Sequence, residues 1–312
     1  MRSPVPGWLR PFVGAMGTLL LLATCAPRSY PYVRLNAERE GVVVAPEQGM
    51  GRLPLRVAVA PVISPRVTFE TYSPLLDYLA DRLDRPAELL QRRTYAETND
   101  LIRTGQADLA FVCGGAFVEG EREGYMELLA IPQINGATTY HALIIVPADS
   151  PFHRLEDLRG RRFAFTDPLS NSGRLYVQYR LARMGENPGG FFGETFFTYS
   201  HDNSIRAVAW GLADGASVDS LVYETLLLNE PDLIARLRVI ERSPPFGVPP
   251  VVVHPGLAPA LKQALREAFL TMDQDPRGRR ALAMVRVERF LPPDPVIYEE
   301  IRRMAAEVRG WP

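Results

Sequence analysis

Two short runs of small polar residues are the parts of this chain best suited to chemistry. Residues 166–173 read Thr-Asp-Pro-Leu-Ser-Asn-Ser-Gly, and residues 200–204 read Ser-His-Asp-Asn-Ser. Each run follows an apolar, β-prone segment and precedes a helical pattern, so each is expected at a helix N-terminus. Unpaired backbone N–H groups and the positive end of the helix dipole bind anions there. Two such sites close together can hold a small oxyanion without Arg or Lys, although ordinary helix capping explains either run alone.

The same residue types allow a catalytic interpretation. Ser170, His201 and Asp219 have the side chains of a Ser–His–Asp triad. Ser170 is not in a Gly-x-Ser-x-Gly elbow, however, and no separate oxyanion feature is visible. We therefore expect a binding protein that is not an enzyme and needs no cofactor. A purely structural lipoprotein would leave both polar runs without a purpose.

The N-terminus predicts export. Arg2 and Arg10 precede an apolar run over residues 12–23, which is too short for a comfortable membrane span and ends in Leu-Ala-Thr-Cys at Cys25. A cysteine at this place resembles the lipobox of bacterial lipoproteins, in which it is acylated. We expect residues 1–24 to be a signal peptide and Cys25 to be the lipidated anchor of a periplasmic protein. A plain secretory signal and an uncleaved anchor are the alternatives.

Composition excludes several classes of protein. With 35 basic and 36 acidic residues, the net charge of −1 creates no strong field toward nucleic acid. If Cys25 is lipidated, the other cysteine, Cys113, has no partner for an internal disulfide. The four histidines lack close metal-ligand spacing, so no metal is expected.

The elements that must position the polar runs alternate between strands and helices. Residues 25–54 have no clear period and are expected to be a tether. Ser73 followed by Pro74 is typical of a helix start. The predicted strands are 55–60, 107–112, 142–147, 162–165, 195–199, 214–216, 237–240 and 251–254, and the predicted helices are 73–83, 98–105, 155–160, 170–184, 204–211, 219–228, 258–274 and 295–308. Such alternation predicts α/β sheets, which bind ligands beyond the carboxyl ends of their strands.

Several motifs in this order resemble those of a known family. They are Thr-Tyr-Ser-Pro-Leu (71–75), Gly-Gln-Ala-Asp-Leu-Ala (105–110), Leu-Glu-Asp-Leu-Arg-Gly (155–160), Ser-Asn-Ser-Gly (170–173), Ser-His-Asp-Asn-Ser (200–204) and Val-Asp-Ser (218–220). The chain resembles the PhnD-like phosphate-, phosphite- and phosphonate-binding proteins of ABC transporters, which have the type II solute-binding fold. Residues 155–160 support only the fold, because that motif recurs in many solute-binding proteins. The last three motifs are narrower and support the oxyanion class.

The resemblance implies a two-lobed α/β protein, each lobe a mainly parallel sheet flanked by helices, with the ligand in a cleft between the lobes. Lobe one would comprise residues 55–139 plus 243–312, and lobe two residues 140–242. Two hinge strands would let the lobes close on a small oxyanion. The partners would be that ligand and a membrane permease, and the protein would be a monomer.

The resemblance also implies which side chains meet the ligand. Tyr72 and Ser73 would contact it from the start of their helix, and Tyr140 and His141 would line the cleft at the hinge. Ser170, Asn171, Ser172, His201 and Asp202 would surround the oxyanion from lobe two. Asp219 would face the same anion, which costs free energy unless the ligand carries a proton or an amino group to donate.

One segment departs from the family. Where relatives have a Gly-Pro run leading to Tyr, residues 113–117 read Cys-Gly-Gly-Ala-Phe. This places the thiol of Cys113 at a strand end facing the cleft and Phe117 where a phenol is usual. A lone cysteine is more often a small buried apolar residue than a ligand. The alternative is a periplasmic sensor that binds arsenite or another thiophilic oxyanion through Cys113 and signals to a membrane histidine kinase.

Overall fold

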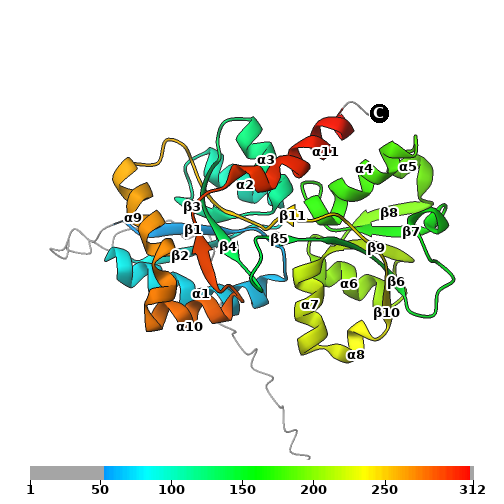
Figure 1. The fold of residues 1–312 in the computed structure, drawn as a ribbon, viewed down its shortest axis with the longest axis horizontal. Coiled ribbons are helices and arrows are strands. Elements are labelled where there is room, and N and C mark those ends of the chain that lie inside the picture. The colour runs from blue at the N-terminus through cyan, green and yellow to red at the C-terminus, as the bar shows by residue number, and fades with distance from the viewer. Residues whose placement is uncertain (1–52, 310–312) are drawn as a thin grey trace, which may run out of the picture. The chain divides into compact units, whose positions relative to one another are not determined.

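The structure, a computed structural model, describes residues 53–309. The predicted signal peptide, the predicted lipidation site Cys25 and nearly all of the predicted tether lie outside these residues. Two sheets form the cores of two lobes (Figure 1). The first has the strand order β13-β4-β12-β3-β1-β2 and the second β10-β6-β9-β7-β8. The strands of the first sheet are β1 (Leu55–Val59), β2 (Ala87–Gln91), β3 (Leu109–Phe111), β4 (Glu127–Gln133), β12 (Val251–Val253) and β13 (Arg289–Leu291); those of the second are β6 (Ala142–Pro147), β7 (Arg162–Phe165), β8 (Glu194–Phe197), β9 (Gly215–Asp219) and β10 (Leu237–Arg242).

The chain passes between the lobes through a two-stranded antiparallel ladder of β5 (Thr139–Tyr140) and β11 (Phe246–Gly247). Strand β6 follows one crossing, and β12 follows the other. Each of these strands pairs antiparallel with both of its neighbours. A chain that arrives from the other lobe enters the sheet at the carboxyl ends of the neighbouring strands. Its first strand must therefore run antiparallel to them.

The α/β fold with two lobes is therefore confirmed, but the sheets are mixed rather than mainly parallel. Parallel pairs occur between β1 and β2, β1 and β3, β7 and β8, and β7 and β9. Strand β13 adds a further antiparallel pair with β4 at the edge of the first sheet. The predicted strands 142–147, 237–240 and 251–254 are present as β6, β10 and β12, whereas β4 and β13 were not predicted. The alternation of strands and helices does not indicate antiparallel pairing, because such pairs need no helical crossover.

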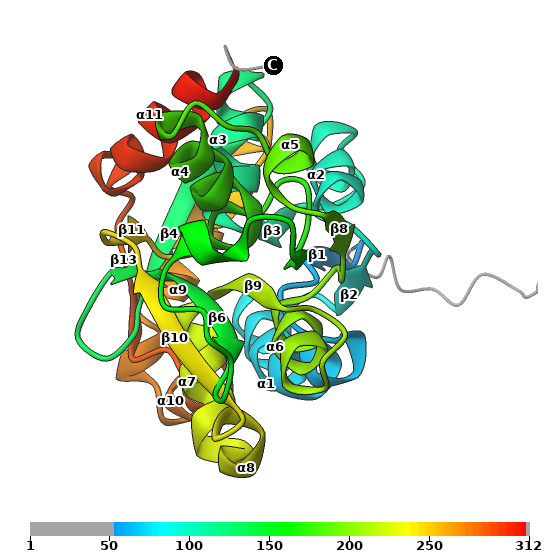
Figure 2. The same ribbon diagram turned by 90° about the vertical axis from the view of Figure 1, so that its right-hand side faces the viewer.

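Helices cover both faces of each sheet (Figures 1 and 2). On one side lie α2, α3 and α11 in the first lobe and α4 and α5 in the second; on the other lie α1 and α10, and α6, α7 and α8. The helices are α1 (Pro65–Leu83), α2 (Tyr95–Arg103), α3 (Gly114–Arg122), α4 (Tyr176–Arg183), α5 (Pro188–Phe191), α6 (His201–Ala209), α7 (Ser220–Asn229), α8 (Pro231–Ile234), α9 (Pro259–Leu270), α10 (Pro276–Met284) and α11 (Glu299–Arg309), with a π-helical segment η2 (Asn171–Leu175) and short 3-10 turns η1 (Leu155–Leu158), η3 (Met272–Gln274) and η4 (Pro295–Tyr298).

Helix α1 corrects one prediction. It begins at Pro65, so Ser73 and Pro74 lie inside the helix rather than at its start. The Ser73 hydroxyl donates to the carbonyl oxygen of Phe69 at 2.7 Å. Pro74 removes one backbone donor, but the helix continues because Leu75 and Leu79 behind it are fully buried against the first sheet.

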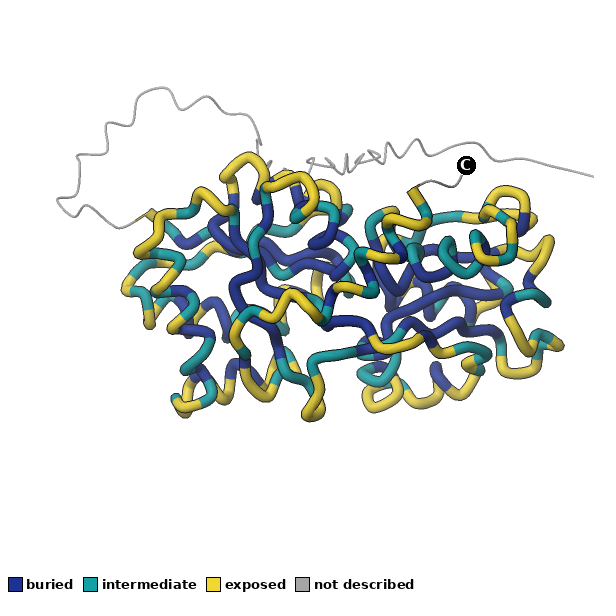
Figure 3. The backbone as a smooth tube through the Cα atoms, turned by 45° about the horizontal axis from the view of Figure 1, so that its top comes forward, coloured by how far each residue is buried: buried dark blue, intermediate teal, exposed yellow. Residues whose placement is uncertain are grey.

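Burial is greatest in the central strands of the two sheets (Figure 3), whereas the edge strands β2, β8 and β10 are partly exposed. One core cluster lies under α1, α9 and α10 and includes Leu79, Phe269 and Leu282. Another joins the α2 and α3 side of the first lobe to the α4 side of the second, from Phe117 to Phe163. Among the described residues, no helix combines the length and the apolar character required to cross a membrane.

Candidate functional site

The carboxyl ends of strands from both sheets lead into helices whose first residues are buried. Strand β2 leads to α2, β3 to α3, β7 to η2, β8 to α6 and β9 to α7. The two polar runs meet here, because the Thr166 hydroxyl lies 3.1 Å from Nδ1 of His201 and 3.2 Å from the Ser204 hydroxyl. The adjacent N-termini predicted from the sequence are therefore present in the fold. No Arg or Lys is needed to make this region attractive to an anion.

Residues 170–172 lie at the start of the π-helical segment. The Ser170 hydroxyl accepts a hydrogen bond from the Gly173 N–H at 2.9 Å, and the Ser170 carbonyl accepts one from the Leu175 N–H at 2.9 Å. This second bond spans five residues, which makes the turn wider than an α-helical turn. Such π-helical turns are often found at functional sites. The Asn171 side-chain amide donates to the Tyr140 hydroxyl at 3.0 Å, and its backbone N–H donates to Sγ of Cys113 at 3.4 Å.

His201 is held neutral with a defined tautomer. Burial lowers the pKa of its imidazole to about 3. Nδ1 accepts a hydrogen bond from the Asp219 N–H at 3.1 Å, so the proton of the neutral ring is on Nε2. The ring therefore offers one N–H donor and carries no charge. Its backbone N–H donates across to the other lobe, to the Val62 carbonyl at 2.9 Å.

Asp219 caps helix α7 and is fully buried. Its Oδ1 accepts from the Leu221 N–H at 2.7 Å, and burial raises its pKa to about 7. Since Nδ1 of His201 contacts the backbone N–H of Asp219 and not its carboxylate, the carboxylate does not orient the imidazole as in a catalytic triad. Ser170 likewise uses its hydroxyl as a helix cap. The geometry of these three residues is that of caps and donors.

Several buried polar atoms around this point have no hydrogen-bond partner. They include the Tyr95 hydroxyl, Oδ1 of Asn171 and the Ser172 hydroxyl, together with Oδ1 of Asp202. Burial raises the pKa of the Tyr140 phenol, and the nearby Ser172 hydroxyl partly offsets that rise. The two hydroxyls are not aligned for a hydrogen bond, so the Ser172 hydroxyl remains without a partner. Buried polar groups are nearly always paired, so unpaired ones from both lobes indicate a place where a polar ligand belongs.

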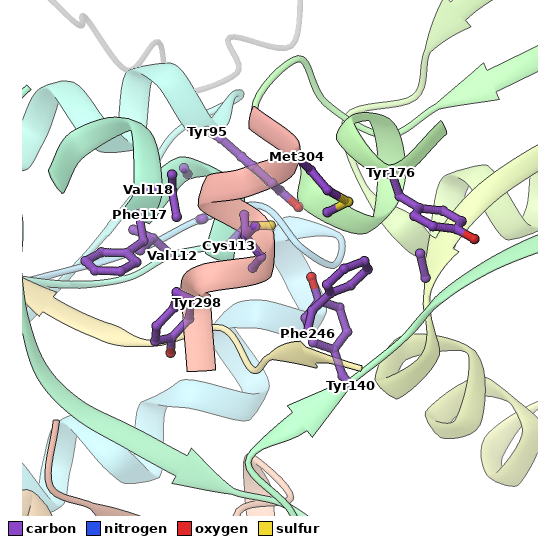
Figure 4. Packing of buried hydrophobic residues seen from close by; sticks show 14 of the residues in the cluster. Tyr95, Val112, Cys113, Phe117, Val118, Tyr140, Tyr176, Phe246, Tyr298 and Met304 are labelled. Carbon is purple, nitrogen blue, oxygen red and sulfur yellow. The ribbon is translucent and has the colours of Figure 1, made fainter. Parts of the chain in front are cut away.

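The convergence is visible in the first lobe and at the hinge (Figure 4). The hydroxyls of Tyr95 and Tyr140 and the sulfur of Cys113 point toward one another from α2, β5 and the start of α3. Burial raises the pKa of the Cys113 thiol, and the nearby Asp219 and Asp167 raise it further. The thiol is therefore neutral, and its sulfur joins the lobes by accepting the Asn171 N–H.

Sequence reasoning missed Tyr95 and Asp167, which connect the lobes. Oδ2 of Asp167 accepts a hydrogen bond from the Tyr95 N–H at 3.1 Å, at the first residue of α2. A signal for this helix start exists in the sequence, because Thr94 and Glu97 have the spacing of a capping box. The Thr94 hydroxyl accepts from the Glu97 N–H at 3.1 Å, and the Glu97 carboxylate accepts from the Arg93 N–H at 3.0 Å. No local pattern indicates that Asp167 meets it.

The other predicted site residues lie around this cluster. Tyr72 packs edge-on against Phe111, with ring centroids 5.0 Å apart, and burial raises its pKa to about 12. Nδ1 of His141 lies 2.7 Å from the Ser243 carbonyl oxygen at the hinge. Ser73, inside α1, does not stand at a helix start as predicted.

A cavity of about 580 Å³ opens between the lobes beside the cluster. Tyr72 and Val112 of the first lobe and Asp202 and Asp219 of the second are among its lining residues. Within residues 53–309, no group of three or more His, Cys, Asp or Glu side chains is arranged to hold a metal ion.

Comparison with known proteins places this geometry in context. A family model described as the periplasmic substrate-binding protein of phosphonate ABC transporters matches residues 57–298. The chain is 27% identical over 210 residues to the phosphate-import protein PhnD of Mycolicibacterium smegmatis, covering 64% of this chain and 65% of that protein. It is 24% identical over 216 residues to the phosphonates-binding periplasmic protein of Escherichia coli, covering 68% of this chain and 64% of that protein. It thus spans just under two thirds of the length of these relatives. The structure of PhnD1 from Prochlorococcus marinus in complex with methylphosphonate superposes with a TM-score of 0.74 at 21% identity, over 82% of this chain and 98% of that one.

Proposed function

The chain belongs to the family of periplasmic substrate-binding proteins of phosphonate ABC transporters, and from this membership we propose that it captures a small phosphorus oxyanion for a membrane permease. The candidate ligands are phosphonate, phosphite and phosphate. Relatives are named for phosphate import and for phosphonate binding, so the family alone does not choose among them.

The observation that carries the proposal is the set of unpartnered buried atoms. The hydroxyls of Tyr95 and Ser172 are donors, and Oδ1 of Asn171 is an acceptor. A bound oxyanion that keeps one proton would satisfy all of them. The neutral His201 adds an N–H donor without adding charge. Multiple hydrogen bonds in a cleft poor in water supply the binding free energy.

Asp219 limits which ligand fits. Its carboxylate beside the site repels a fully ionised oxyanion, but it stabilises a ligand that donates a proton or an amino group. With its pKa raised to about 7 by burial, Asp219 is itself partly protonated near neutral pH. We infer that the protein selects a singly ionised or amino-bearing ligand.

Binding is coupled to closure of the lobes in this proposal. The lobes, with the boundaries 55–139 plus 243–312 and 140–242, move about the β5–β11 crossing. In the closed form Asp167 contacts Tyr95 and Asn171 contacts Cys113. A ligand that binds the closed form more tightly shifts the population toward it, and a permease recognises that form. The chain would act as a monomer in the periplasm, attached to a membrane through lipidated Cys25.

A thermal-shift panel tests the proposal on the chain that begins after Cys25. The ligands are phosphite, phosphate, methylphosphonate, 2-aminoethylphosphonate, sulfate, arsenate and arsenite. A ligand at about a hundred times its Kd should stabilise the protein by roughly 2.7 kcal/mol. A shift with a phosphorus oxyanion supports uptake, and its loss in Ser172→Ala locates the site. A shift with arsenite alone supports the sensor alternative instead, and no shift at all refutes the ligand class.

A further inference from the structure

The interlobe cavity is larger than a small phosphorus oxyanion needs. Methylphosphonate has about five heavy atoms; even if each took the share of a water molecule in the liquid, roughly 30 Å³, it would fill no more than about 150 Å³. The cavity measures about 580 Å³, within the range of roughly 300–1,000 Å³ typical of sites for larger organic ligands. Tyr95, Asn171 and Ser172 are not among its lining residues, so its volume lies beside the oxyanion site and is available to the rest of a ligand.

This extra volume forms a groove that runs from a buried end to an exposed end. At the buried end lie Val112, which is 1% exposed, and Asp219, which is 2% exposed. At the other end lie Leu227 and Met284, which are 47% and 50% exposed. Residues of helix α7 in the second lobe and of helices α1 and α10 in the first lobe line this groove.

The walls away from Asp219 are mainly apolar and come from both lobes. Val67, Tyr72 and Phe111 belong to the first lobe, and Val222 and Leu227 belong to the second. Among the charged residues that line the groove, Arg206 is paired with Glu230 at 2.6 and 2.8 Å. The groove thus offers apolar surface to whatever extends from the buried polar cluster toward solvent.

The groove and the cluster adjoin at the first turns of α6 and α7. Asp202 and Asp219 both line the groove. Oδ1 of Asp202 is one of the unpartnered buried atoms, and the Asp219 N–H donates to Nδ1 of His201 at 3.1 Å. A ligand with its oxyanion on the cluster can therefore extend a substituent past Asp219 between α1 and α7.

We propose that the ligand is an organophosphonate with an apolar substituent of several carbons, which lies in this groove. The inference rests on the proposed function, because it assumes that the oxyanion binds at the buried cluster. The protein would then prefer alkyl- or arylphosphonates to methylphosphonate, phosphite and phosphate. Each methylene that becomes fully buried improves the Kd by up to about fourfold, which corresponds to ~0.8 kcal/mol.

Calorimetric titration with methylphosphonate and n-hexylphosphonate tests this inference. We expect n-hexylphosphonate to bind at least tenfold more tightly. Leu227→Glu places a charge in the groove and should remove most of that advantage while leaving the Kd of methylphosphonate within about twofold. The matched control is Leu212→Glu, since Leu212 is also an exposed leucine of the second lobe, at 58%, but is not part of the groove.

Two results would overturn the inference and leave the proposed function standing. One is equal or tighter binding of methylphosphonate by the unsubstituted protein. The other is an advantage of n-hexylphosphonate that survives Leu227→Glu. If neither phosphonate binds, the proposed function itself fails, and the inference fails with it.

Discussion

At Gly115 of the first lobe, the backbone of the second lobe leaves no room for a side chain. A Cβ atom built at this position would lie 2.5 Å from the carbonyl oxygen of Leu169 and 3.0 Å from the backbone nitrogen of Asn171. Both atoms belong to the backbone of the second lobe, whereas Gly115 belongs to α3 of the first. Backbone atoms cannot move aside as the end of a flexible side chain can, so the lobes themselves must separate.

The substitution Gly115→Ala should therefore weaken ligand binding without unfolding either lobe. Restoring ordinary contact distances of about 3.5 Å requires a displacement of about 1 Å at this point. Overpacking of this kind costs typically about 1–3 kcal/mol. If this cost destabilises only the form in which the two lobes touch at Gly115, the Kd rises by roughly 5- to 150-fold. Lobes that stand farther apart at this point would have no such clash, and alanine in α3 favours the helix there.

The assay is calorimetric titration of methylphosphonate into both proteins, with unfolding of the unliganded proteins measured alongside. Gly189→Ala is the matched control, because its Cβ would meet only Oδ1 of Asn187 at 3.6 Å. We expect Gly189→Ala to bind like the unsubstituted protein. Gly115→Ala with an unchanged Kd would refute the reasoning that the lobes close at Gly115 when the ligand binds.

Three further predictions concern single side chains. Asp167→Ala leaves the buried Tyr95 N–H without its acceptor, at a cost of about 1–3 kcal/mol, so the Kd of methylphosphonate should rise about tenfold or more. Asp167→Asn keeps an acceptor and should raise the Kd less. Equal effects of the two substitutions in titration would contradict this. Asp219, with a pKa raised to about 7 in the fold and near 4 when unfolded, contributes stability below pH 4 that is lost as the pH rises through 7. Asp219→Asn keeps the cap, so its free energy of unfolding should exceed that of the unsubstituted protein by up to about 4 kcal/mol at pH 8 but not at pH 4. Urea unfolding measures this difference, and a difference that does not change with pH would refute the assignment. Cys113→Ser preserves an acceptor for the Asn171 N–H and should keep the Kd of methylphosphonate within about threefold in titration; a tenfold loss would show that the sulfur contacts the ligand.

The parts of the fold that local pattern encodes could be predicted from the sequence. The polar runs at 166–173 and 200–204 do mark adjacent helix starts, because residues that favour the N-cap are a short-range signal. Ser170 caps the π-helical segment with its hydroxyl, and Ser200 occupies the N-cap of α6 without a side-chain bond. Asp219 caps α7 where the start of a helix was predicted. The pair Ser73–Pro74 has the same kind of signal, but the helix start predicted there is wrong. Helix α1 already begins at Pro65, and burial of its leucines lets the helix continue past Pro74.

The contacts between the lobes could not be predicted in this way. Asp167 and Tyr95 are 72 positions apart, and Asn171 and Cys113 are 58 apart. Nothing in either segment specifies its partner, because each pairing depends on how two separately formed sheets meet. The need for glycine at position 115 has the same origin, since the clash is with the other lobe. The antiparallel direction of β12 follows from the chain's return across the hinge, and the pairing of β13 with β4 joins segments far apart in the chain; neither has a local signature.

The most direct test of the account is a titration of Tyr95→Phe combined with Ser172→Ala against phosphite, phosphate and methylphosphonate, beside the unsubstituted protein. Both hydroxyls are buried and unpartnered without ligand, so removing them should leave the unliganded protein as stable as before or more so. If they bind the oxyanion, the Kd should rise at least tenfold, because hydrogen bonds to charged groups contribute about 1.5–3 kcal/mol each. A Kd within twofold of that of the unsubstituted protein would contradict the claim that this cluster is where the oxyanion binds.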